Sequence, residues 1–276
     1  PGSLSGTHLP TACRTEMTAK SPLSGRFGSA NSGHKWGLQL RRAGYDYLAV
    51  EGRAARPQVL YIDDGEVILE DATPLWGQDT WFTVDWIREH KGKDFEVACI
   101  GPAGENLVAF ACILNNHHAA WGRTGLGAVM GSKNLKAIAV RGKGKINIAR
   151  PEAFPGIKKE AFQKIRQEVS FGMTRKYGSM VVSSPINKMG GLPGRNYTRG
   201  SLPSWEETRG RRVFRERYKL KSLGCFSCPI ACKYLSGAAE GPWQGYTAVG
   251  PEVTHVLEFG ARLDLQSIPE ILKCVE

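Results

Sequence analysis

Residues 58–70 read QVLYIDDGEVILE and are the clearest indication of the fold. Two partly apolar runs, 58–62 and 66–70, flank the turn sequence Asp63-Asp64-Gly65. Asp-Gly between two alternating runs is a strong signal for a β-hairpin, because these residues accept the positive φ angles of a tight turn. We therefore expect two antiparallel strands here.

Further apolar runs on either side of this hairpin predict more strands. They are 46–51 (DYLAVE), 95–100 (FEVACI), 107–114 (LVAFACIL) and 135–140 (LKAIAV). The last three are continuously apolar, which is typical of strands buried on both faces. One helix is expected at 79–90, where Phe82 and Trp86 are four residues apart and share a face.

The character of the sequence changes near residues 143–145. Helices are expected at 151–169, at 174–189 with an interruption at Pro185, and within 250–276, with a Gly/Pro-rich loop at 190–200. The pattern predicts an α+β fold. We place a β-rich domain at residues 1–148 and the start of a multihelical domain at 149–276.

The composition is that of a globular protein. The chain has 276 residues, of which 41% are hydrophobic, enough to fill a core. No apolar run reaches 18 residues, so no transmembrane helix is expected, and no signal peptide is recognisable at the start. The chain begins without Met and ends inside an expected helix, which indicates a fragment.

The net charge is +11, and much of the excess lies in residues 209–221, which contain seven Lys and Arg residues and one Glu. A nucleic-acid surface is one interpretation, but no nucleic-acid-binding motif accompanies the charge. A solvated helix face or a docking face for an acidic protein are the alternatives.

Three of the seven cysteines lie together in the stretch Gly224–Lys233, GCFSCPIACK. The spacing Cys225-x2-Cys228-x3-Cys232 lets three thiolates converge on one centre, and a [4Fe–4S] cluster needs four such ligands. A zinc site is the main alternative, and a site without metal is the third. The pattern indicates a reducing, cytoplasmic compartment. The remaining cysteines are expected in the core: Cys13, Cys99, Cys112 and Cys274.

Three segments carry glycines beside polar side chains: 20–37, 101–106 and 122–136. Glycine lets backbone amides approach an anion closely, so such loops suit the phosphates of a large cofactor. The spacing matches neither a Rossmann fingerprint nor a Walker A motif. Taken singly, each segment is also explained by tight turns.

Together these motifs resemble the tungsten-containing aldehyde ferredoxin oxidoreductase family. The resemblance rests on KSPLSGRFGSANSG (20–33), AGYDYLAVEG (43–52), LWGQDTW (75–81), IGPAGEN (100–106), GRTGLGAVMGSKNLKAIAV (122–140), LPGRNY (192–197), the cysteine stretch and Gly250-Pro251-Glu252. The matches follow family order over nearly the whole chain. The chain then lacks a short N-terminal piece and a large C-terminal part.

The resemblance implies a tungsten (or molybdenum) ion held by two pterins, a magnesium ion that links the pterin phosphates, and a nearby [4Fe–4S] cluster. It implies that Cys225, Cys228 and Cys232 are cluster ligands, with the fourth cysteine beyond Glu276. Arg14 lies between cluster and pterin, Glu252 near the metal, and the backbone carbonyl of Asn31 faces magnesium. A second such carbonyl belongs to Ala120 or Trp121, and the cofactor-binding stretch continues with Gly122, Arg123 and Gly125.

The implied activity is oxidation of a small aldehyde to a carboxylic acid, with electrons passing through the cluster to ferredoxin. The resemblance allows a homo-oligomer and favours neither a nucleic acid nor a membrane as partner. We expect the stretch 209–221 to dock ferredoxin. The alternatives are a non-catalytic iron–sulfur paralogue, a family member with a non-aldehyde substrate, and a zinc-stabilised basic binding module.

One departure from the family concerns the residues after Gly250-Pro251-Glu252. Many members continue with an aromatic residue, Glu and Thr, whereas Val253, Thr254 and His255 follow here, with Glu258 three residues later. On a helix, Glu252, His255 and Glu258 share one face. They indicate either an altered substrate pocket or a structural use of these side chains.

Overall fold

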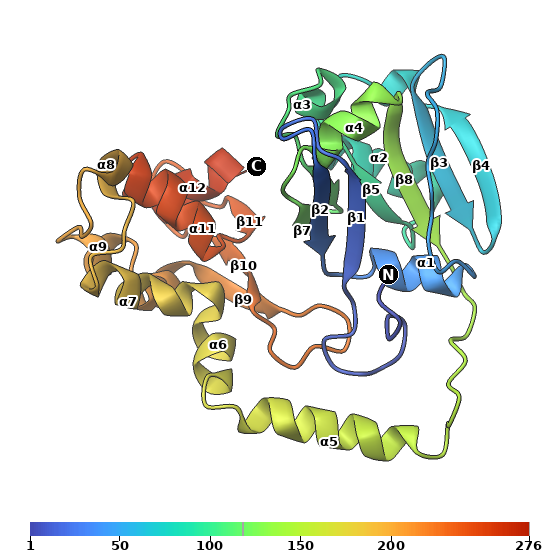
Figure 1. The fold of residues 1–276 in the computed structure, drawn as a ribbon. Helices are drawn as coiled ribbons and strands as arrows, with labels where there is room; N and C mark the ends of the chain where they lie inside the picture. The colour runs from blue at the N-terminus through green and yellow to red at the C-terminus, as the bar shows by residue number, and fades with distance from the viewer. Residues whose placement is uncertain (118, 276) are drawn as a thin grey trace. The chain divides into compact units, whose positions relative to one another are not determined.

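The computed structural model describes residues 1–117 and 119–275, and the chain divides into two compact units (Figure 1). Unit 1 comprises residues 1–158 together with 225–227. Unit 2 comprises residues 159–224 and 228–276. The α+β fold class is confirmed, since both units combine helices with sheets. No helix in the described part of the chain is long and apolar enough to cross a membrane.

Unit 1 is built on a six-stranded mixed sheet with the order β4-β3-β8-β5-β6-β7. Strands β3 and β8 run parallel, and the pairs β4–β3, β8–β5, β5–β6 and β6–β7 are antiparallel. The strands are β3 (Gln58–Asp63), β4 (Glu66–Asp71), β5 (Glu96–Cys99), β6 (Ile113–Asn115), β7 (Ala119–Trp121) and β8 (Leu135–Arg141). The hairpin prediction is confirmed: β3 pairs with β4, and Asp64 and Gly65 in the turn both have positive φ.

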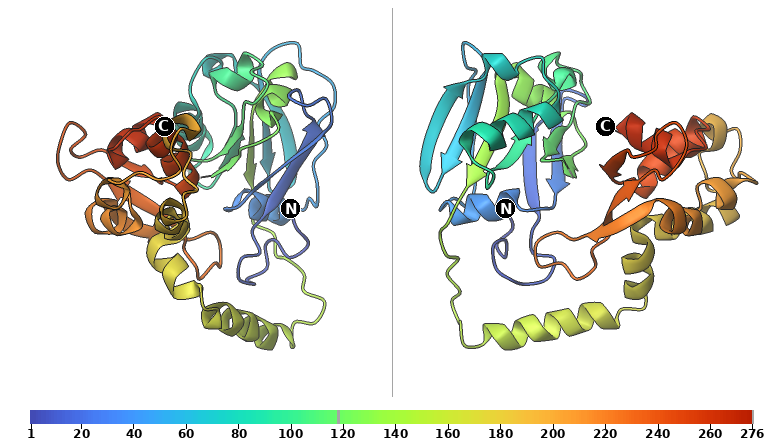
Figure 2. Two further views of the ribbon diagram at one scale, coloured as in Figure 1. Left: turned by 60° about the vertical axis from the view of Figure 1, so that its left-hand side comes forward. Right: turned by 180° about the vertical axis from the view of Figure 1, so that it is seen from behind.

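Both faces of this sheet are covered, which explains its continuously apolar strands. On one face, Val59 and Tyr61 pack with α2 (Thr80–Lys91), which lies across the sheet in the right-hand view of Figure 2. On the other face, Leu60 and Ile62 pack with α1 (Trp36–Arg42) and α4 (Leu126–Ser132). The helix expected at 79–90 is thus confirmed, and the Asp79 side chain caps it by accepting a 2.7 Å hydrogen bond from the Phe82 amide.

A separate two-stranded ribbon, β1 (Thr15–Lys20) and β2 (Phe27–Ser32), lies on the α1 side of the sheet (Figure 1). Trp121 of β7 anchors it, because its indole N–H donates a 2.9 Å hydrogen bond to the Thr15 carbonyl. Trp36 packs edge-on against Trp121 with ring centroids 5.7 Å apart. The ribbon therefore has a fixed place in unit 1, and its ends carry the sequence-predicted residues Arg14 and Asn31.

Unit 2 combines short helices with a three-stranded antiparallel sheet of order β11-β10-β9. The strands are β9 (Lys219–Leu223), β10 (Lys233–Gly237) and β11 (Thr247–Val249). The main helices are α5 (Phe154–Gln167, which begins in unit 1), α6 (Phe171–Tyr177), α7 (Ser183–Lys188) and α12 (Ile268–Val275), with shorter turns α8 (Gly194–Tyr197), α9 (Trp205–Thr208), α10 (Arg211–Val213) and α11 (Val253–His255). A further short helix, α3 (Pro102–Glu105), lies in unit 1. The sequence predicted α5, α6, α7 and the helical closing segment, but not α3, α8, α9 or the sheet of unit 2. The interruption expected at Pro185 was wrong, because Pro185 lies within α7 and the break comes earlier, at Gly178–Val182.

Several expectations from the sequence were wrong, among them the core position of Cys112, which is only partly buried. Residues 46–51 form no strand, and Tyr47 within them is 80% exposed. The expected strand 107–114 is limited to β6, because Leu107 adopts a left-handed backbone conformation and Phe110 points to solvent. Cys274 is exposed rather than buried, since α12 buries the stripe formed by Ile268, Ile271 and Leu272 instead.

Candidate functional site

Arg14 and Asn31 contact one another at the open end of the β1–β2 ribbon. The Arg14 guanidinium donates one hydrogen bond to the Asn31 side-chain oxygen and a second, of 3.1 Å, to the Asn31 carbonyl. The Asn31 amide group donates a 2.9 Å bond to Glu16, which lies directly opposite on β1. Hydrogen bonds from Ser29 and then Asn31 lower the pKa of Glu16, with nearby Arg123 contributing.

Cys225 lies beside this network, because residues 225–227 belong to unit 1. A Cβ atom placed on Gly33 would come within 3.1 Å of the Cys225 sulfur and 3.2 Å of an Arg14 guanidinium nitrogen. Gly33 is itself held by Asn115, a fully buried side chain of β6 that donates a 2.7 Å hydrogen bond to the Gly33 carbonyl. The absence of a side chain at Gly33 therefore leaves room for both the thiol and the guanidinium.

The two residues after Cys225 are also fixed within unit 1. The Phe226 ring lies 5.0 Å from the His8 ring, and the Arg42 guanidinium stands 6.0 Å from the Phe226 centroid. The Ser227 hydroxyl donates a 2.8 Å hydrogen bond to the His8 carbonyl. These contacts hold the backbone on which Cys225 is carried.

Cys228 and Cys232 belong to unit 2. The Arg175 guanidinium donates a hydrogen bond to the Pro229 carbonyl between them. Gly178 packs against the backbone of Cys232, because a Cβ there would lie only 2.3 Å from the Cys232 carbonyl oxygen. Among residues 1–117 and 119–275, no group of three or more His, Cys, Asp or Glu side chains is arranged to hold a metal ion.

Glu252, the candidate catalytic carboxylate, precedes α11 in unit 2. One of its carboxylate oxygens accepts a 2.6 Å hydrogen bond from the Ser179 hydroxyl, and Ser179 in turn accepts a 3.0 Å bond from the Val253 amide. His255 is part of the same arrangement: its Nδ1 accepts a 3.2 Å bond from the Glu252 amide in a capping box. Glu258 instead pairs with Arg262 at 2.9 Å on the surface. These contacts support the structural use of His255 and Glu258.

The remaining predicted residues lie around β7. Ala120 and Trp121 are within the strand, and Trp121 is fully buried, so its side chain has a packing role. Gly122 and Arg123 are exposed. Gly125 has a left-handed conformation, and a Cβ there would meet the Ala109 carbonyl oxygen at 2.0 Å, so packing alone requires glycine at this position.

Three of the quoted motifs meet at one buried ion pair in unit 1. Lys136, which is 0% exposed, pairs with Glu105 of the 100–106 motif and donates a 2.7 Å hydrogen bond to the Gln78 carbonyl of the 75–81 motif. Glu105 also accepts a 2.8 Å bond from the Gly77 amide. These motifs therefore have a structural role that their sequences alone did not disclose.

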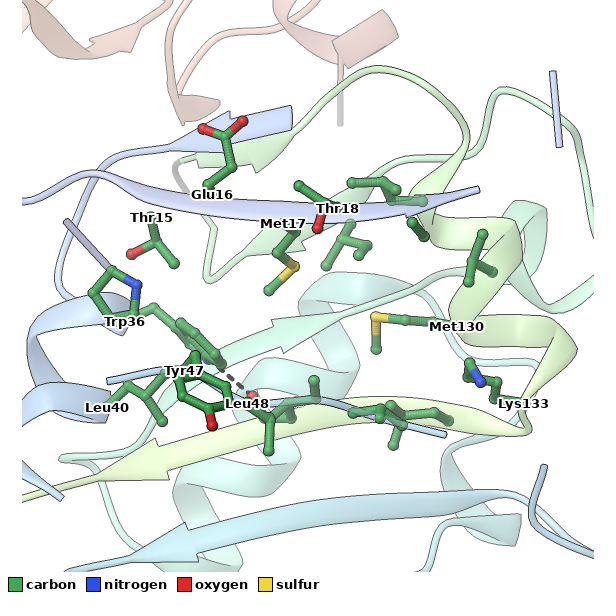
Figure 3. A pocket seen from close by; sticks show the side chains of 18 residues that line it. Thr15, Glu16, Met17, Thr18, Trp36, Leu40, Tyr47, Leu48, Met130 and Lys133 are labelled. Atoms are coloured by element: carbon green, nitrogen blue, oxygen red, sulfur yellow. Dashed lines mark hydrogen bonds between the residues drawn. The ribbon is translucent and has the colours of Figure 1, made fainter. Parts of the chain in front are cut away.

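An apolar cavity of about 300 Å³ lies between the ribbon and the large sheet (Figure 3). Met17 and Met130 point into it, whereas the Glu16 side chain points away from it (Figure 3). Of the described residues that line it, none is among those predicted to bind a cofactor or a metal. Glu16, which accepts a hydrogen bond from Asn31, borders the cavity, so the Arg14–Asn31 network adjoins it.

Comparison with known protein families identifies the chain. Residues 1–142 match the description "Aldehyde ferredoxin oxidoreductase, N-terminal domain", and residues 156–276 match "Aldehyde ferredoxin oxidoreductase, domains 2 & 3". The chain belongs to the aldehyde ferredoxin oxidoreductase family. The resemblance drawn from the sequence motifs is thereby confirmed.

Comparison with individual relatives supports the same family assignment. The chain is 40% identical to a tungsten-containing aldehyde ferredoxin oxidoreductase of Pyrococcus furiosus, over 99% of this chain and 44% of that protein. It is 30% identical to the aliphatic sulfonate oxidoreductase WOR-like subunit of the same organism, over 91% of this chain and 42% of the relative. The chain thus spans less than half the length of these relatives.

A solved structure shares the fold. The active-site complex BamBC of benzoyl coenzyme A reductase, in complex with 1,5-dienoyl-CoA, superposes with a TM-score of 0.78. The match covers 99% of this chain and 42% of that one at 24% sequence identity.

Proposed function

We propose that the protein to which this chain contributes oxidises an aldehyde to a carboxylic acid at a tungsten bis-pterin centre and passes the electrons through a [4Fe–4S] cluster to ferredoxin. Per turnover, the aldehyde and one water yield the acid, two protons and two electrons. Family membership and the 40% identity to proteins named as tungsten-containing aldehyde ferredoxin oxidoreductases support this proposal. The observation that carries it is that Arg14 is hydrogen-bonded to Asn31 while its guanidinium and the Cys225 thiol both border the space beside Gly33.

The three clustered cysteines fit an iron–sulfur cluster. Their side chains are half-buried, and thiolates are the ligands that [4Fe–4S] clusters use. Cys225 lies in a space that a side chain at position 33 would fill. Cys225, Cys228 and Cys232 would supply three ligands, and Arg14 would place a positive charge and hydrogen-bond donors beside the first of them.

The ends of the β1–β2 ribbon and of β7 fit the anionic part of a pterin cofactor. Arg14 and exposed Arg123 supply positive charge there, around the Asn31–Glu16 pair. The Asn31 carbonyl accepts a hydrogen bond from Arg14, and a carbonyl oxygen is a type of ligand that suits magnesium. We assign the second carbonyl ligand to Ala120 or Trp121. The bound metal would supply the two-electron redox chemistry and activate an oxygen atom.

Glu252 would accept a proton released during the oxidation. A general base must have a fixed orientation toward the reacting group, and Ser179 fixes one of its oxygens at 2.6 Å. Ser179 is a positioning residue in this scheme, because it acts through Glu252.

The direct test uses the full-length gene product, purified without air. Aldehyde-dependent reduction of a viologen dye is the expected result. Two of its relatives are named for other reactions, an aliphatic sulfonate oxidoreductase subunit and glyceraldehyde-3-phosphate:ferredoxin oxidoreductase. Dye reduction with an aliphatic sulfonate and none with any aldehyde would overturn the assigned substrate, and no reduction with either would favour a non-catalytic paralogue.

A further inference from the structure

Unit 1 carries a basic surface that is assembled from residues far apart in the sequence. Two adjoining hollows share Lys143 in their linings. Lys35 and Lys93 line the first hollow, and Arg42 and Lys145 line the second. We call these five residues, Lys35, Arg42, Lys93, Lys143 and Lys145, the basic patch.

The charges of the basic patch are not neutralised. Across residues 1–117 and 119–275, none of its five side chains forms a salt bridge, whereas Arg141, in the same lining, pairs with Asp63. Two acidic residues also line the first hollow, Asp94 and Glu96. Glu96 is only 8% exposed and accepts a 2.6 Å hydrogen bond from Asn116, so it contributes little to the surface potential. Asp94 is exposed, and so is Asp64, which accepts a 3.0 Å hydrogen bond from the Lys143 amide. The five cations outnumber these two exposed carboxylates, so the surface attracts anionic groups.

The basic patch is adjacent to the segment that carries Cys225. Arg42 stands over the Phe226 ring, and His8, which lines the second hollow, contacts both Phe226 and Ser227. All of these residues belong to unit 1. A protein bound at the patch would thus come close to the proposed cluster, and electron transfer falls steeply with distance.

Residues 209–221 expose less positive charge at the surface than their composition indicates. Arg209 is 0% exposed and donates hydrogen bonds to the carbonyls of Gly260 and Leu265. Arg211 donates a 3.0 Å bond to the Val181 carbonyl. The expectation that the whole run forms a docking face is therefore wrong for Arg209, and the exposed arginines of the run are Arg212, Arg215 and Arg217.

We propose that the basic patch of unit 1 is the docking surface for a small acidic iron–sulfur protein that accepts the electrons. The inference rests on the proposed function, since the partner is the acceptor of that reaction. In each transfer one electron leaves the reduced [4Fe–4S] cluster, which is oxidised, and reduces the acceptor's cluster. Two such transfers follow each aldehyde oxidised. Complementary charge would steer the acidic partner to the face beside Cys225.

The test measures binding of a purified acidic ferredoxin to the full-length protein by titration calorimetry at low ionic strength. Lys143→Glu/Lys145→Glu is expected to raise the Kd about tenfold or more, because two attractions become repulsions. Lys143→Ala/Lys145→Ala should raise it by a smaller factor. The matched control, Arg215→Glu/Arg217→Glu, makes the same change of charge and should shift the Kd less than twofold. Circular dichroism checks that each variant is folded.

Two outcomes would overturn the docking surface: an unchanged Kd in both lysine variants, or a larger increase in the arginine variant. The wild-type Kd should also rise steeply with salt, because exposed charges are screened. Failure of the proposed function is distinguishable, since it would appear as wild-type protein that binds ferredoxin yet reduces no viologen dye with any aldehyde.

Discussion

The Ser179 hydroxyl donates a 2.6 Å hydrogen bond to the Glu252 carboxylate and accepts one from the Val253 amide. Ser179 directly follows Gly178, whose backbone packs against Cys232. Within unit 2, the carboxylate assigned to proton transfer and one of the proposed cluster ligands are therefore held by two consecutive residues.

Replacing Ser179 should impair turnover more than cofactor binding. In Ser179→Ala, Glu252 loses a charge-assisted hydrogen bond of roughly 1.5–3 kcal/mol and its fixed orientation. We expect kcat to fall about tenfold, with KM for the aldehyde and tungsten content unchanged. Ser179→Thr keeps the hydroxyl and should recover most of the activity. Equal kcat in the alanine variant and the wild type would remove Ser179 from the mechanism.

The His255 cap should make stability depend on pH. Burial, opposed by the Glu252 charge, lowers the pKa of His255 below its ordinary value of 6.5. The unfolded chain then binds more protons than the folded one, so this contribution is present above pH 6.5 and is lost as the pH falls below it. Only the neutral ring can accept the hydrogen bond from the Glu252 amide.

We expect the Tm to fall between about pH 7 and pH 5 by more in the wild type than in His255→Gln. Glutamine at this helix position can accept the same hydrogen bond but does not titrate. Thermal melts of the two proteins at several pH values check the point. Parallel pH profiles would show that His255 does not cause the dependence.

Removing one partner of the buried Lys136–Glu105 pair should strongly destabilise the folded protein. Glu105→Gln leaves the buried Lys136 charge without its partner, at a cost of about 3–5 kcal/mol. In the double variant Glu105→Gln/Lys136→Met the charge is gone, so the loss should be smaller than for Glu105→Gln alone. Urea unfolding of the three proteins measures it. A double variant that loses as much stability as Glu105→Gln, or more, would refute the coupling.

Arg14 should tune the reduction potential of the proposed cluster. A positive charge near Cys225 stabilises the added electron, so Arg14→Gln should lower the midpoint potential, on the order of 50 mV. Arg14→Lys keeps the charge but not the two bonds to Asn31, and should shift the potential less. Potentiometric titration distinguishes the two variants. An unchanged potential in Arg14→Gln would contradict the placement of this guanidinium beside the cluster.

Local signals predicted the elements whose side chains face an apolar core. The run 135–140 specifies β8, whose two faces are buried, and the turn at Asp64-Gly65 specifies the hairpin of β3 and β4, although β4 itself is largely exposed. The same reasoning failed for 107–114, where the apolar run begins at a left-handed Leu107. Hydrophobicity alone could not distinguish a strand from a turn with exposed apolar side chains.

The sequence alone could not predict the contacts between residues that are far apart in the chain. The ribbon strands β1 and β2 are rich in small and polar residues, so no apolar alternation indicated them. Glu16, Asn115 and Ser179 were missed, because each gains its role from a partner elsewhere in the chain. The family motifs gave Arg14 and Asn31, yet the hydrogen bonds between them follow from the strand pairing.

The most direct test of the account is the metal content of the full-length protein, purified without air, combined with its electron paramagnetic resonance spectrum after reduction. We expect tungsten, about four iron atoms per chain and the signal of a reduced [4Fe–4S] cluster, with iron lost in Cys228→Ala. Zinc bound to the cysteines, or protein without iron, would contradict it.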